Sequence, residues 1–243
     1  MSEAPLLEVV GVSKQFRGLR AVDDVGFTVP HGSIVALIGP NGAGKTTCFN
    51  LIAGVYKPDT GRIRLDGADI TGLRPDQACN AGIGRTFQIV RPFGGLSVVE
   101  NVIVGALRRS ADVAAARHIA LEILERLGLA GKASSPASAL TLPERKRLET
   151  ARALATGPKI LLLDEVMAGL RPVEIDRMVT TFTTLSRETG LTILLTEHVM
   201  RAVMALSQKI VVLHHGQKIA EGPPETVSRD KAVLQSYLGG AAS

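Results

Sequence analysis

The amino-acid sequence predicts an α/β fold with a mostly parallel core sheet. Four short, continuous apolar runs carry this prediction, at residues 33–38, 160–163, 191–195 and 210–213. Strands that are apolar on both faces are typical of the buried interior of a parallel sheet. Segments with helical periodicity lie between the runs, as expected where short buried strands alternate with helices.

The N-terminal part of the chain predicts three further short strands. They are expected at residues 6–10, 25–29 and 62–65, where turn residues separate apolar segments. The run at 33–38 passes directly into a glycine-rich turn, and the apolar segment 48–52 that follows suits a helix. The first part of the chain therefore combines short strands with one strand–turn–helix unit.

Two helices are predicted from apolar faces that end at a glycine. Residues 119–127 form one face and Gly128 suits the C-cap; residues 175–185 form another, closed by Gly190. Residues 85–150 carry helical patterns and no convincing strand. We expect one domain over residues 1–243, with residues 85–150 as a helical subdomain inserted between strands of the sheet.

Composition excludes several classes of protein. The 28 Lys and Arg exceed the 23 Asp and Glu only slightly, and no block of five like charges suggests a nucleic-acid partner. Aromatic residues are only 3%, too few for a stacking surface. Cys48 and Cys79 are too few for a disulfide framework or a four-cysteine metal site, and are expected to be a packing residue and an ordinary thiol. Without an 18-residue apolar stretch or a secretory signal, the chain is expected to stay in the cytosol.

A phosphate-binding loop is the strongest functional signal. The pattern G-x-x-x-x-G-K-[ST] stands between a predicted strand and a predicted helix, which is the context that this motif requires. Its backbone amides and the helix N-terminus can hold phosphate oxygens, while Lys45 suits the β- and γ-phosphates and Thr46 suits Mg²⁺. The residues expected to bind the phosphates of a nucleotide here are Gly39, Pro40, Asn41, Gly42, Ala43, Gly44, Lys45, Thr46 and Thr47.

Two carboxylates end the apolar run at residues 160–163. Asp164 is a candidate ligand of Mg²⁺, and Glu165 is a candidate general base for the water that attacks the γ-phosphate. A strand that ends in Asp-Glu is common by itself. Together with the phosphate loop earlier in the chain, it predicts a nucleotide hydrolase.

These two motifs and the residues between them resemble the nucleotide-binding subunits of ABC transporters over essentially the whole chain. The resemblance implies a P-loop ABC ATPase fold with an N-terminal antiparallel β subdomain. It also implies that Gln88 ligates Mg²⁺ and relays changes to membrane subunits, that His198 contacts the γ-phosphate, and that Phe16 stacks on adenine. A lone Gln or His would carry no such meaning, and Phe16 also suits a core position.

The family's signature segment, Leu-Ser-Gly-Gly-Gln, is expected at residues 140–144, and the sequence departs from it there. Thr141 and Glu144 form a capping box that starts a helix, and the Thr141 hydroxyl can still face a γ-phosphate of an opposing subunit. Leu142 and Pro143 replace both glycines, and Pro143 has no N–H to donate. The segment Arg145–Arg147 is expected to be a solvated basic face.

Within the family, the chain resembles the ATP-binding subunits for branched-chain amino acids. The segments that carry this weaker resemblance are 16–22, 84–88, 168–172 and 233–239. Similar ATPases serve importers of amides, urea or aromatic acids, so these substrates stay open.

The function expected from the resemblance is ATP hydrolysis that drives a membrane importer. The implied partners are integral-membrane permease subunits and a second ATP-binding subunit in a homo- or heterodimer, with the chain peripheral on the inner face of the cell membrane. One alternative is a subunit with weak hydrolysis that needs a partner ATPase. A small-molecule kinase, a GTPase or a two-cassette DNA-repair or translation ATPase fits less well, because their typical segments are missing from this sequence.

Overall fold

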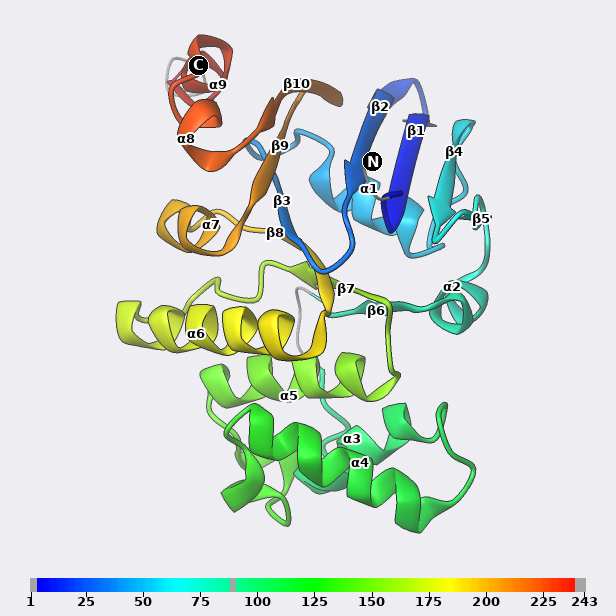
Figure 1. Cartoon of the computed structure of the whole chain (residues 1–243), viewed down its shortest axis with the longest axis vertical. Coiled ribbons are helices and arrows are strands. Elements are labelled where there is room, and N and C mark those ends of the chain that lie inside the picture. Colours follow the sequence, from blue (N-terminus) through cyan, green and yellow to red (C-terminus); the bar gives the residue numbers. More distant parts are fainter. Residues whose placement is uncertain (1–3, 88–90, 239–243) are drawn as a thin grey trace.

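The computed structural model describes residues 4–87 and 91–238, and it has the α/β fold that the sequence predicts (Figure 1). The elements, in chain order, are β1 (Leu7–Phe16), β2 (Leu19–Val29), β3 (Ile34–Ile38), α1 (Lys45–Ile52), β4 (Thr60–Leu65), β5 (Ala68–Asp69), α2 (Pro75–Ala81), β6 (Ile83–Arg85), α3 (Val98–Ala106), α4 (Val113–Arg126), the 3₁₀ helices η1 (Ala130–Lys132) and η2 (Ala137–Ala139), α5 (Leu142–Ala155), β7 (Ile160–Asp164), α6 (Pro172–Thr189), β8 (Thr192–Thr196), α7 (Met200–Leu206), β9 (Lys209–His214), β10 (Gln217–Gly222), α8 (Pro224–Val227) and α9 (Lys231–Leu238).

The central sheet confirms the prediction of a mostly parallel core. Its strand order is β10-β9-β3-β8-β7-β6, and every neighbouring pair is parallel except β10 with β9. Side chains alternate between the two faces, so that Val35 and Leu37 of β3 pack into one hydrophobic cluster while Ile34 and Ile38 pack into another. Continuous apolar strands arise because both faces of this sheet are buried.

The N-terminal strands form a separate antiparallel sheet in the order β2-β1-β4-β5. Strands β1 and β2 extend further toward their shared turn than the apolar residues alone predict. Strand β1 lies between β2 and β4, so that Leu7 pairs with both Val29 and Leu65. The cluster between the two sheets also takes in Cys48 and Phe49 of α1. The helix after the phosphate loop is therefore enclosed between both sheets.

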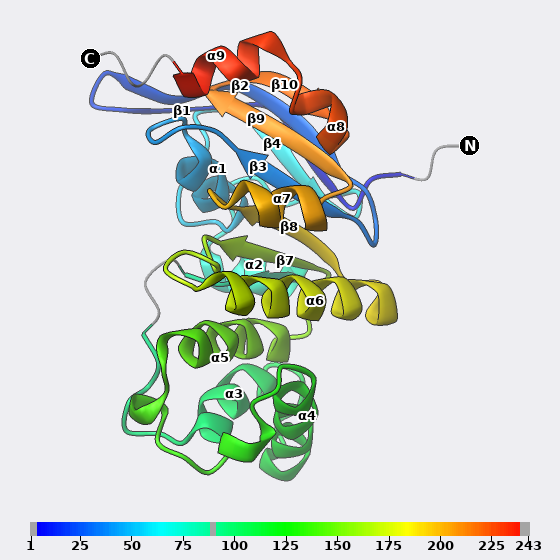
Figure 2. The ribbon, with the colours of Figure 1, turned by 90° about the vertical axis from the view of Figure 1, so that its left-hand side faces the viewer.

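Helices α6 and α7 cover the other face of the central sheet (Figure 2). The predicted apolar face of α6 is buried at Ile175, Met178, Phe182 and Leu185. Gly190 caps this helix with a left-handed φ of 68°, which confirms the predicted end.

Helices α3, α4 and α5 share a hydrophobic cluster of their own at one end of the molecule (Figure 1). The segment between β6 and β7 is helical, as the sequence predicts, although β6 extends to Arg85 and α5 continues to Ala155. In the described ranges no helix is both long and apolar enough to cross a membrane. The division of residues 85–150 from the rest as a subdomain stays a prediction.

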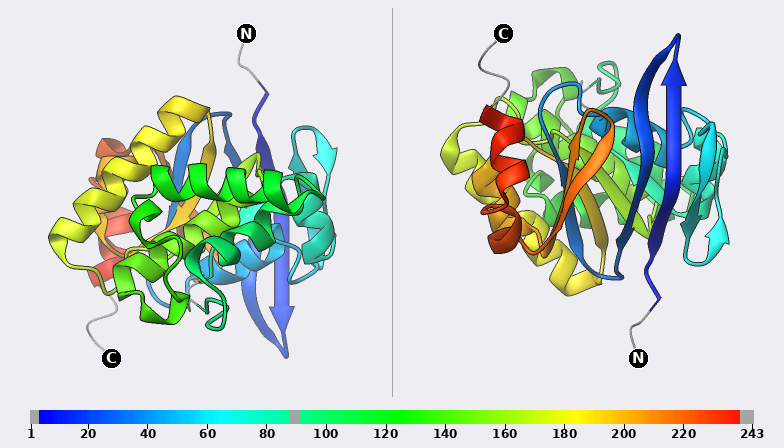
Figure 3. Two further views of the ribbon diagram at one scale, coloured as in Figure 1. Left: turned by 90° about the horizontal axis from the view of Figure 1, so that it is seen from below. Right: turned by 90° about the horizontal axis from the view of Figure 1, so that it is seen from above.

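Several elements carry no sequence signal strong enough to predict them. Strand β6 has three residues, and β10 is a polar edge strand with no fully buried side chain. The β9–β10 hairpin lies between β2 and the C-terminal helices α8 and α9 (Figure 3). Period-2 alternation is weak in β10 because this strand is at the edge of its sheet, beside β2 and two short helices.

The close approach of α3 to α5 gives a test of the helical packing. An added Cβ at Gly105 would lie 2.5 Å from the carbonyl oxygen of Arg152, a backbone atom that cannot move independently. Alanine favours a helix over glycine by about 1 kcal/mol, whereas overpacking costs about 1–3 kcal/mol. We therefore expect Gly105→Ala to lower the free energy of unfolding by about 1–2 kcal/mol, measured by urea denaturation.

Gly131→Ala is the matched control, because Gly131 lies in the 3₁₀ helix η1 and its added Cβ would meet nothing within 4 Å. This control should be neutral or slightly stabilising. Equal stability of the Gly105→Ala variant and the wild type would contradict the close packing of α3 on α5.

Candidate functional site

The candidate site lies where three neighbouring parallel strands end. Strand β8 is hydrogen-bonded to β3 on one side and to β7 on the other, so the carboxyl ends of all three meet at one edge of the sheet. The phosphate loop follows β3, Asp164 and Glu165 stand at the end of β7, and His198 follows β8. In open α/β sheets this edge is the usual place for a ligand.

The phosphate loop needs glycine at two positions because backbone of other segments lies against it. A Cβ at Gly39 would collide with the carbonyl oxygen of Leu213 in β9, and one at Gly44 with the carbonyl oxygen of Ala21 in β2. Both glycines also have a positive φ, 150° and 100°, which side chains disfavour. The loop is therefore fitted between the N-terminal sheet and the β9–β10 hairpin.

Lys45 is buried at the start of α1, with 6% of its surface exposed. Its ammonium donates to the carbonyl oxygens of Gly39 (2.8 Å) and Pro40 (3.0 Å). Burial lowers the pKa of Lys45, while the carboxylates of Glu165 and Asp164 act in the opposite direction. The structure thus brings Lys45 and both predicted carboxylates into one electrostatic environment.

A cavity of about 600 Å³ opens beside the loop. Its lining combines residues from both sheets and from the strand ends: Phe16, Leu19, Arg20, Ala21, Asn41, Gly42, Ala43, Gly44, Lys45, Thr46, Thr47, Glu165 and His215. The loop, Phe16 and Glu165 therefore share one hollow, as the sequence predicts for a nucleotide. His215, which belongs to no motif, was not predicted from the sequence, and Arg20 was assigned no role within the segment 16–22.

Phe16 stands at the end of β1 and is about one-third exposed. Its ring meets that of Tyr56 edge-on, with centroids 5.0 Å apart, and the ammonium of Lys14 lies 5.6 Å from the Phe16 centroid. An exposed ring supported from behind by a second ring is suited to a planar ligand.

Asp164 is buried at the end of β7 and is held by residues that the sequence did not single out. Its Oδ1 accepts a hydrogen bond from Thr196 Oγ1 at 2.8 Å, and its Oδ2 accepts one from Arg85 at 3.1 Å. The backbone N–H of Asp164 donates to Thr86 Oγ1. Strands β6 and β8 thus fix this carboxylate from both sides.

Glu165 and His198 form a direct pair. His198 Nε2 lies 2.8 Å from Glu165 Oε1, and the Glu165 side chain is only 14% exposed. The Glu165 backbone has a φ of 49°, a left-handed conformation that is strained for a residue other than glycine. Strained backbone is often found at functional sites, where surrounding structure holds it in place.

Two buried charges next to this pair were not predicted. Glu197 is 1% exposed, and its Oε1 accepts a hydrogen bond from the N–H of Met167 at 2.7 Å. Burial raises the pKa of Glu197 to about 7. Lys146 of α5 is 5% exposed, and burial lowers its pKa while four neighbouring carboxylates act in the opposite direction.

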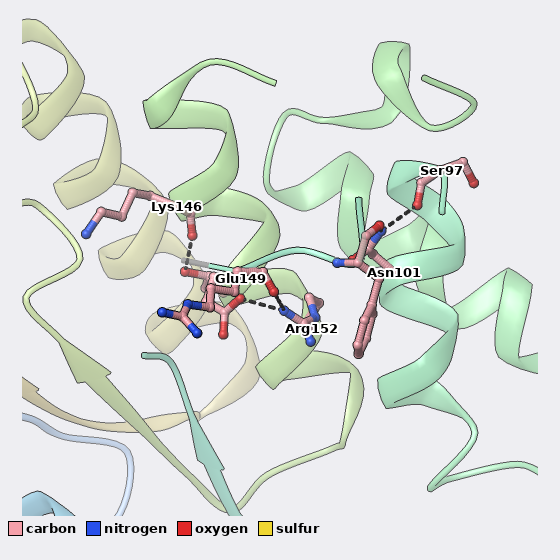
Figure 4. Close-up of polar contacts among 8 residues, drawn as sticks. Ser97, Asn101, Lys146, Glu149 and Arg152 are labelled. Carbon is pink, nitrogen blue, oxygen red and sulfur yellow. Dashed lines mark hydrogen bonds and ion pairs between the residues drawn. The ribbon is translucent and has the colours of Figure 1, made fainter. Parts of the chain in front are cut away.

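Gln88 lies outside the described residues, so the structure does not place it. The residues on either side of 88–90 contact α5. Glu149 accepts a hydrogen bond from the backbone of Phe87, and Arg152 donates to the carbonyl oxygen of Arg91 at 3.2 Å. Glu149 and Arg152 also bond to each other at 2.8 Å (Figure 4).

The chain after this segment is fixed by α3 as well. Asn101 is fully buried and exchanges hydrogen bonds with both backbone groups of Phe93. Its side-chain amide also donates to the carbonyl oxygen of Ser97 at 2.9 Å (Figure 4). The guanidinium of Arg152 stacks 4.6 Å from the centre of the Phe93 ring. Helices α3 and α5 therefore hold the path of the backbone just beyond residue 90.

The signature position begins α5, as the capping box predicts. Thr141 is the N-cap, and both its N–H and its hydroxyl donate to Glu144 Oε2, at 2.8 and 2.9 Å. Leu142 and Pro143 are the first two helical residues. Lys132 forms an ion pair with Glu144 at 2.8 Å, and these bonds lower the pKa of Glu144 to about 2.

The structure does not bring Thr141 to the phosphate-loop cavity. Thr141 lines a smaller hollow of about 200 Å³ with residues of α5 and α6. Cys48 is fully buried, and burial raises the pKa of its thiol to about 12, which agrees with the expected packing role. Of the residues predicted to act together, those of the loop, Asp164, Glu165 and His198 are gathered at one edge of the central sheet, and Phe16 of β1 lines the same cavity as the loop and Glu165.

Comparison with known proteins gives consistent matches over the whole chain. A family model described as ABC transporter matches residues 22–168, and one described as branched-chain amino acid ATP-binding cassette transporter matches residues 217–243. The high-affinity branched-chain amino acid transport ATP-binding protein BraF of Pseudomonas aeruginosa is 41% identical over 98% of this chain and 99% of its own length. The corresponding protein LivG of Escherichia coli is 40% identical, with the same coverage of both chains. A crystal structure of an ATP-binding cassette of an ABC transporter in its ADP conformation superposes with a TM-score of 0.88, at 31% identity, covering 98% of this chain and 100% of that one.

The ionised Glu144 carboxylate should stabilise the protein in a pH-dependent way. Because folding lowers the pKa of Glu144 from 4.5 to about 2, its contribution is full above pH 4.5 and is lost as the pH falls toward 2. We expect Glu144→Gln to lower the free energy of unfolding by about 1 kcal/mol at pH 7, the usual size of a capping contribution. Urea denaturation of both proteins between pH 7 and pH 3 should show this difference shrinking in acid.

Glu125→Gln, on an exposed position of α4, is the control and should leave stability unchanged at neutral pH. A difference between wild type and Glu144→Gln that stayed constant across the pH range would contradict the link between folding and this ionisation.

Proposed function

The chain belongs to the ABC transporter family as an ATP-binding subunit, and from this premise we propose that it hydrolyses ATP to drive an importer of branched-chain amino acids. The observation that carries the catalytic part is the Glu165–His198 pair beside the phosphate-loop cavity. The substrate class is supported by the C-terminal match at residues 217–243 and by the names of the relatives. Amides, urea and aromatic acids stay as alternative substrates, because this chain carries no transport pathway of its own in the described residues.

The cavity supports a division of labour among the proposed residues. The amides of the phosphate loop and Lys45 bind the β- and γ-phosphates of ATP, and the Phe16 ring takes the adenine. Glu165 accepts the proton of the attacking water, and His198, already bonded to Glu165, contacts the γ-phosphate. Positioning and charge stabilisation supply most of the rate in phosphoryl transfer, which suits a site built from backbone amides and one lysine.

Mg²⁺ fits this site without a dedicated protein cage. No cluster of three or more His, Cys, Asp or Glu gathers as a metal site in residues 4–87 and 91–238. Phosphate-bound Mg²⁺ keeps several waters and takes only one or two carboxylates from the protein, so the fixed Asp164 carboxylate and the Thr46 hydroxyl in the cavity suit it. When bound, the ion neutralises charge on the phosphates. Gln88 is proposed as a third contact from the resemblance alone.

The separation of Thr141 from the cavity supports a dimer. In a head-to-tail pair, the signature segment of one subunit faces the ATP held by the loop of the other. The second subunit is a further copy or a related ATP-binding chain, and permease subunits form the membrane pathway. We propose a peripheral position on the inner face of the membrane, with residues 85–150 as the subdomain that docks on the permease.

Replacing the proposed general base tests hydrolysis directly. Glu165→Gln keeps the size of the side chain and its contact with His198 but removes the proton acceptor. We expect magnesium-dependent ATP turnover of the purified chain to fall about 10²–10⁴-fold, while ATP still binds. Size-exclusion chromatography in the presence of ATP should then show that the Glu165→Gln variant is trapped as a dimer.

Glu225→Gln, on an exposed position of α8, is the matched control and should turn over like the wild type. Undiminished turnover by Glu165→Gln would refute the role of Glu165.

The altered signature predicts slow turnover by a homodimer. Pro143 has no N–H, and the Thr141 hydroxyl already donates to Glu144. A hydrogen bond to a charged group contributes about 1.5–3 kcal/mol, so Leu142→Gly with Pro143→Gly should raise homodimer turnover roughly 10-fold or more. This prediction is checked by measuring ATP turnover per bound nucleotide, together with thermal stability, for the double-glycine variant and the wild type.

Adding Glu165→Gln to the double-glycine variant should abolish the gain. A double-glycine variant no faster than the wild type would mean that this segment does not limit the rate, and the proposal of a partner ATPase that completes the site would lose its support.

A further inference from the structure

Lys146 is a buried cation that none of the motifs explains. It lies on α5, five residues after the N-cap Thr141, and only 5% of its surface is exposed. Its ammonium points away from the Glu149–Arg152 ion pair on the same helix (Figure 4). It reaches instead to the end of β7, where the two predicted carboxylates stand.

The contact that Lys146 makes there is with the main chain of Glu165. Lys146 Nζ donates to the carbonyl oxygen of Glu165 at 3.1 Å, and the N–H of Glu165 donates to the carbonyl oxygen of Thr196 at 3.0 Å. The Glu165 carbonyl also accepts a longer bond of 3.3 Å from the N–H of Ala168. Both backbone groups of Glu165 are therefore held, the N–H by β8 and the carbonyl by α5 together with the turn that follows β7. A left-handed φ of 49° costs of order 1–3 kcal/mol for a residue other than glycine, and such a conformation persists only where its surroundings fix it.

The charges around Lys146 also favour this position. Four neighbouring carboxylates raise the pKa of the Lys146 ammonium: those of Glu197, Glu165, Asp164 and Glu149. Arg85 bonds to Asp164 and Arg152 bonds to Glu149, whereas Glu197 Oε2 is buried and has no hydrogen-bond partner among the described residues. The Lys146 ammonium lowers the pKa of Glu197, against the effect of burial, so the ionised form of Glu197 gives Lys146 an electrostatic reason to stay at this point.

We propose that Lys146 is a positioning residue for ATP hydrolysis. It holds the Glu165 main chain in the left-handed conformation that directs the carboxylate to His198 beside the cavity. Because Lys146 belongs to the helix that begins at the signature position, it also fixes Glu165 relative to that helix. The proposal rests on the proposed function, since it requires Glu165 to act on the attacking water.

A positioning role and a purely structural role make different kinetic predictions. If Lys146 orients Glu165, its removal should slow the chemical step and leave ATP binding intact, because the phosphate loop is built from other segments. If Lys146 only balances the charge of Glu197, its removal should lower stability, and ATP binding and turnover should fall together with the folded fraction.

The test is steady-state ATP turnover and equilibrium binding of a non-hydrolysable ATP analogue by the full chain. We expect Lys146→Met to lower kcat at least 10-fold per bound nucleotide, with the KM for ATP and the analogue Kd changed less than twofold. Lys146→Arg keeps a charged donor, and its kcat should lie closer to the wild type. Lys159→Met is the control, because Lys159 sits at the opposite end of β7 in an exposed ion pair with Asp66.

A second variant keeps the proposal testable if Lys146→Met does not fold. Combining Lys146→Met with Glu197→Gln removes the charge on both partners, so the fold no longer needs the ammonium. Low kcat in this folded double variant supports the positioning role, since the Glu165 carbonyl still lacks the ammonium of α5 and keeps only the 3.3 Å bond from the N–H of Ala168. Wild-type kcat in either folded variant overturns it.

The failure of the two proposals can be told apart. If the wild-type chain hydrolyses ATP and Lys146→Met does so equally fast, only the positioning role is overturned. If the wild-type chain binds ATP and never hydrolyses it, the proposed ATPase activity of this chain fails, and the positioning role fails with it.

Discussion

The parallel pairing of β8 with both β3 and β7 is the constraint on which the site depends. It places the ends of three strands side by side. The phosphate loop follows β3, the Asp164–Glu165 pair stands at the end of β7, and His198 follows β8. The pairing in turn requires burial of both faces of the sheet, because these strands are apolar on both sides. Any change that exposed one face would separate residues that lie more than 100 positions apart in the chain, such as Lys45 and Glu165.

Sequence patterns were sufficient where a local rule fixes the outcome. The phosphate loop follows a strand and opens a helix, Gly190 ends α6, and Thr141 with Glu144 starts α5, each as its pattern predicts. Patterns failed where the outcome depends on a distant partner. Nothing near Lys146 in the sequence indicates that its ammonium meets the Glu165 carbonyl, and Thr196 carries no sign of its bond to Asp164. Such contacts arise only when the sheet brings the segments together.

Helix α5 stands at the centre of the polar network outside the cavity. Its N-terminus holds the altered signature, Lys146 contacts the end of β7, and Glu149 with Arg152 holds the backbone on either side of residues 88–90. Lys146, Glu149 and Arg152 follow one another at helical spacing. Lys146 and Glu149 are buried and Arg152 is partly buried, although surface helices usually leave such positions to solvent. The sequence shows a basic run here and predicts a solvated face; for Lys146 this prediction is wrong, because the ammonium is enclosed by carboxylates.

The fit of the phosphate loop between two other segments has a consequence for the exit of products. The N–H of Gly216 donates to the Ala43 carbonyl at 3.1 Å, and Gly39 and Gly44 leave no room for movement toward β9 or β2. A loop held in this way has little room to rearrange, so we expect little ordering entropy to be lost when ATP binds. For the same reason we expect the loop to change little when ADP leaves. The departure of ADP is then expected to begin on the open side of the cavity, which faces the second subunit in the proposed dimer.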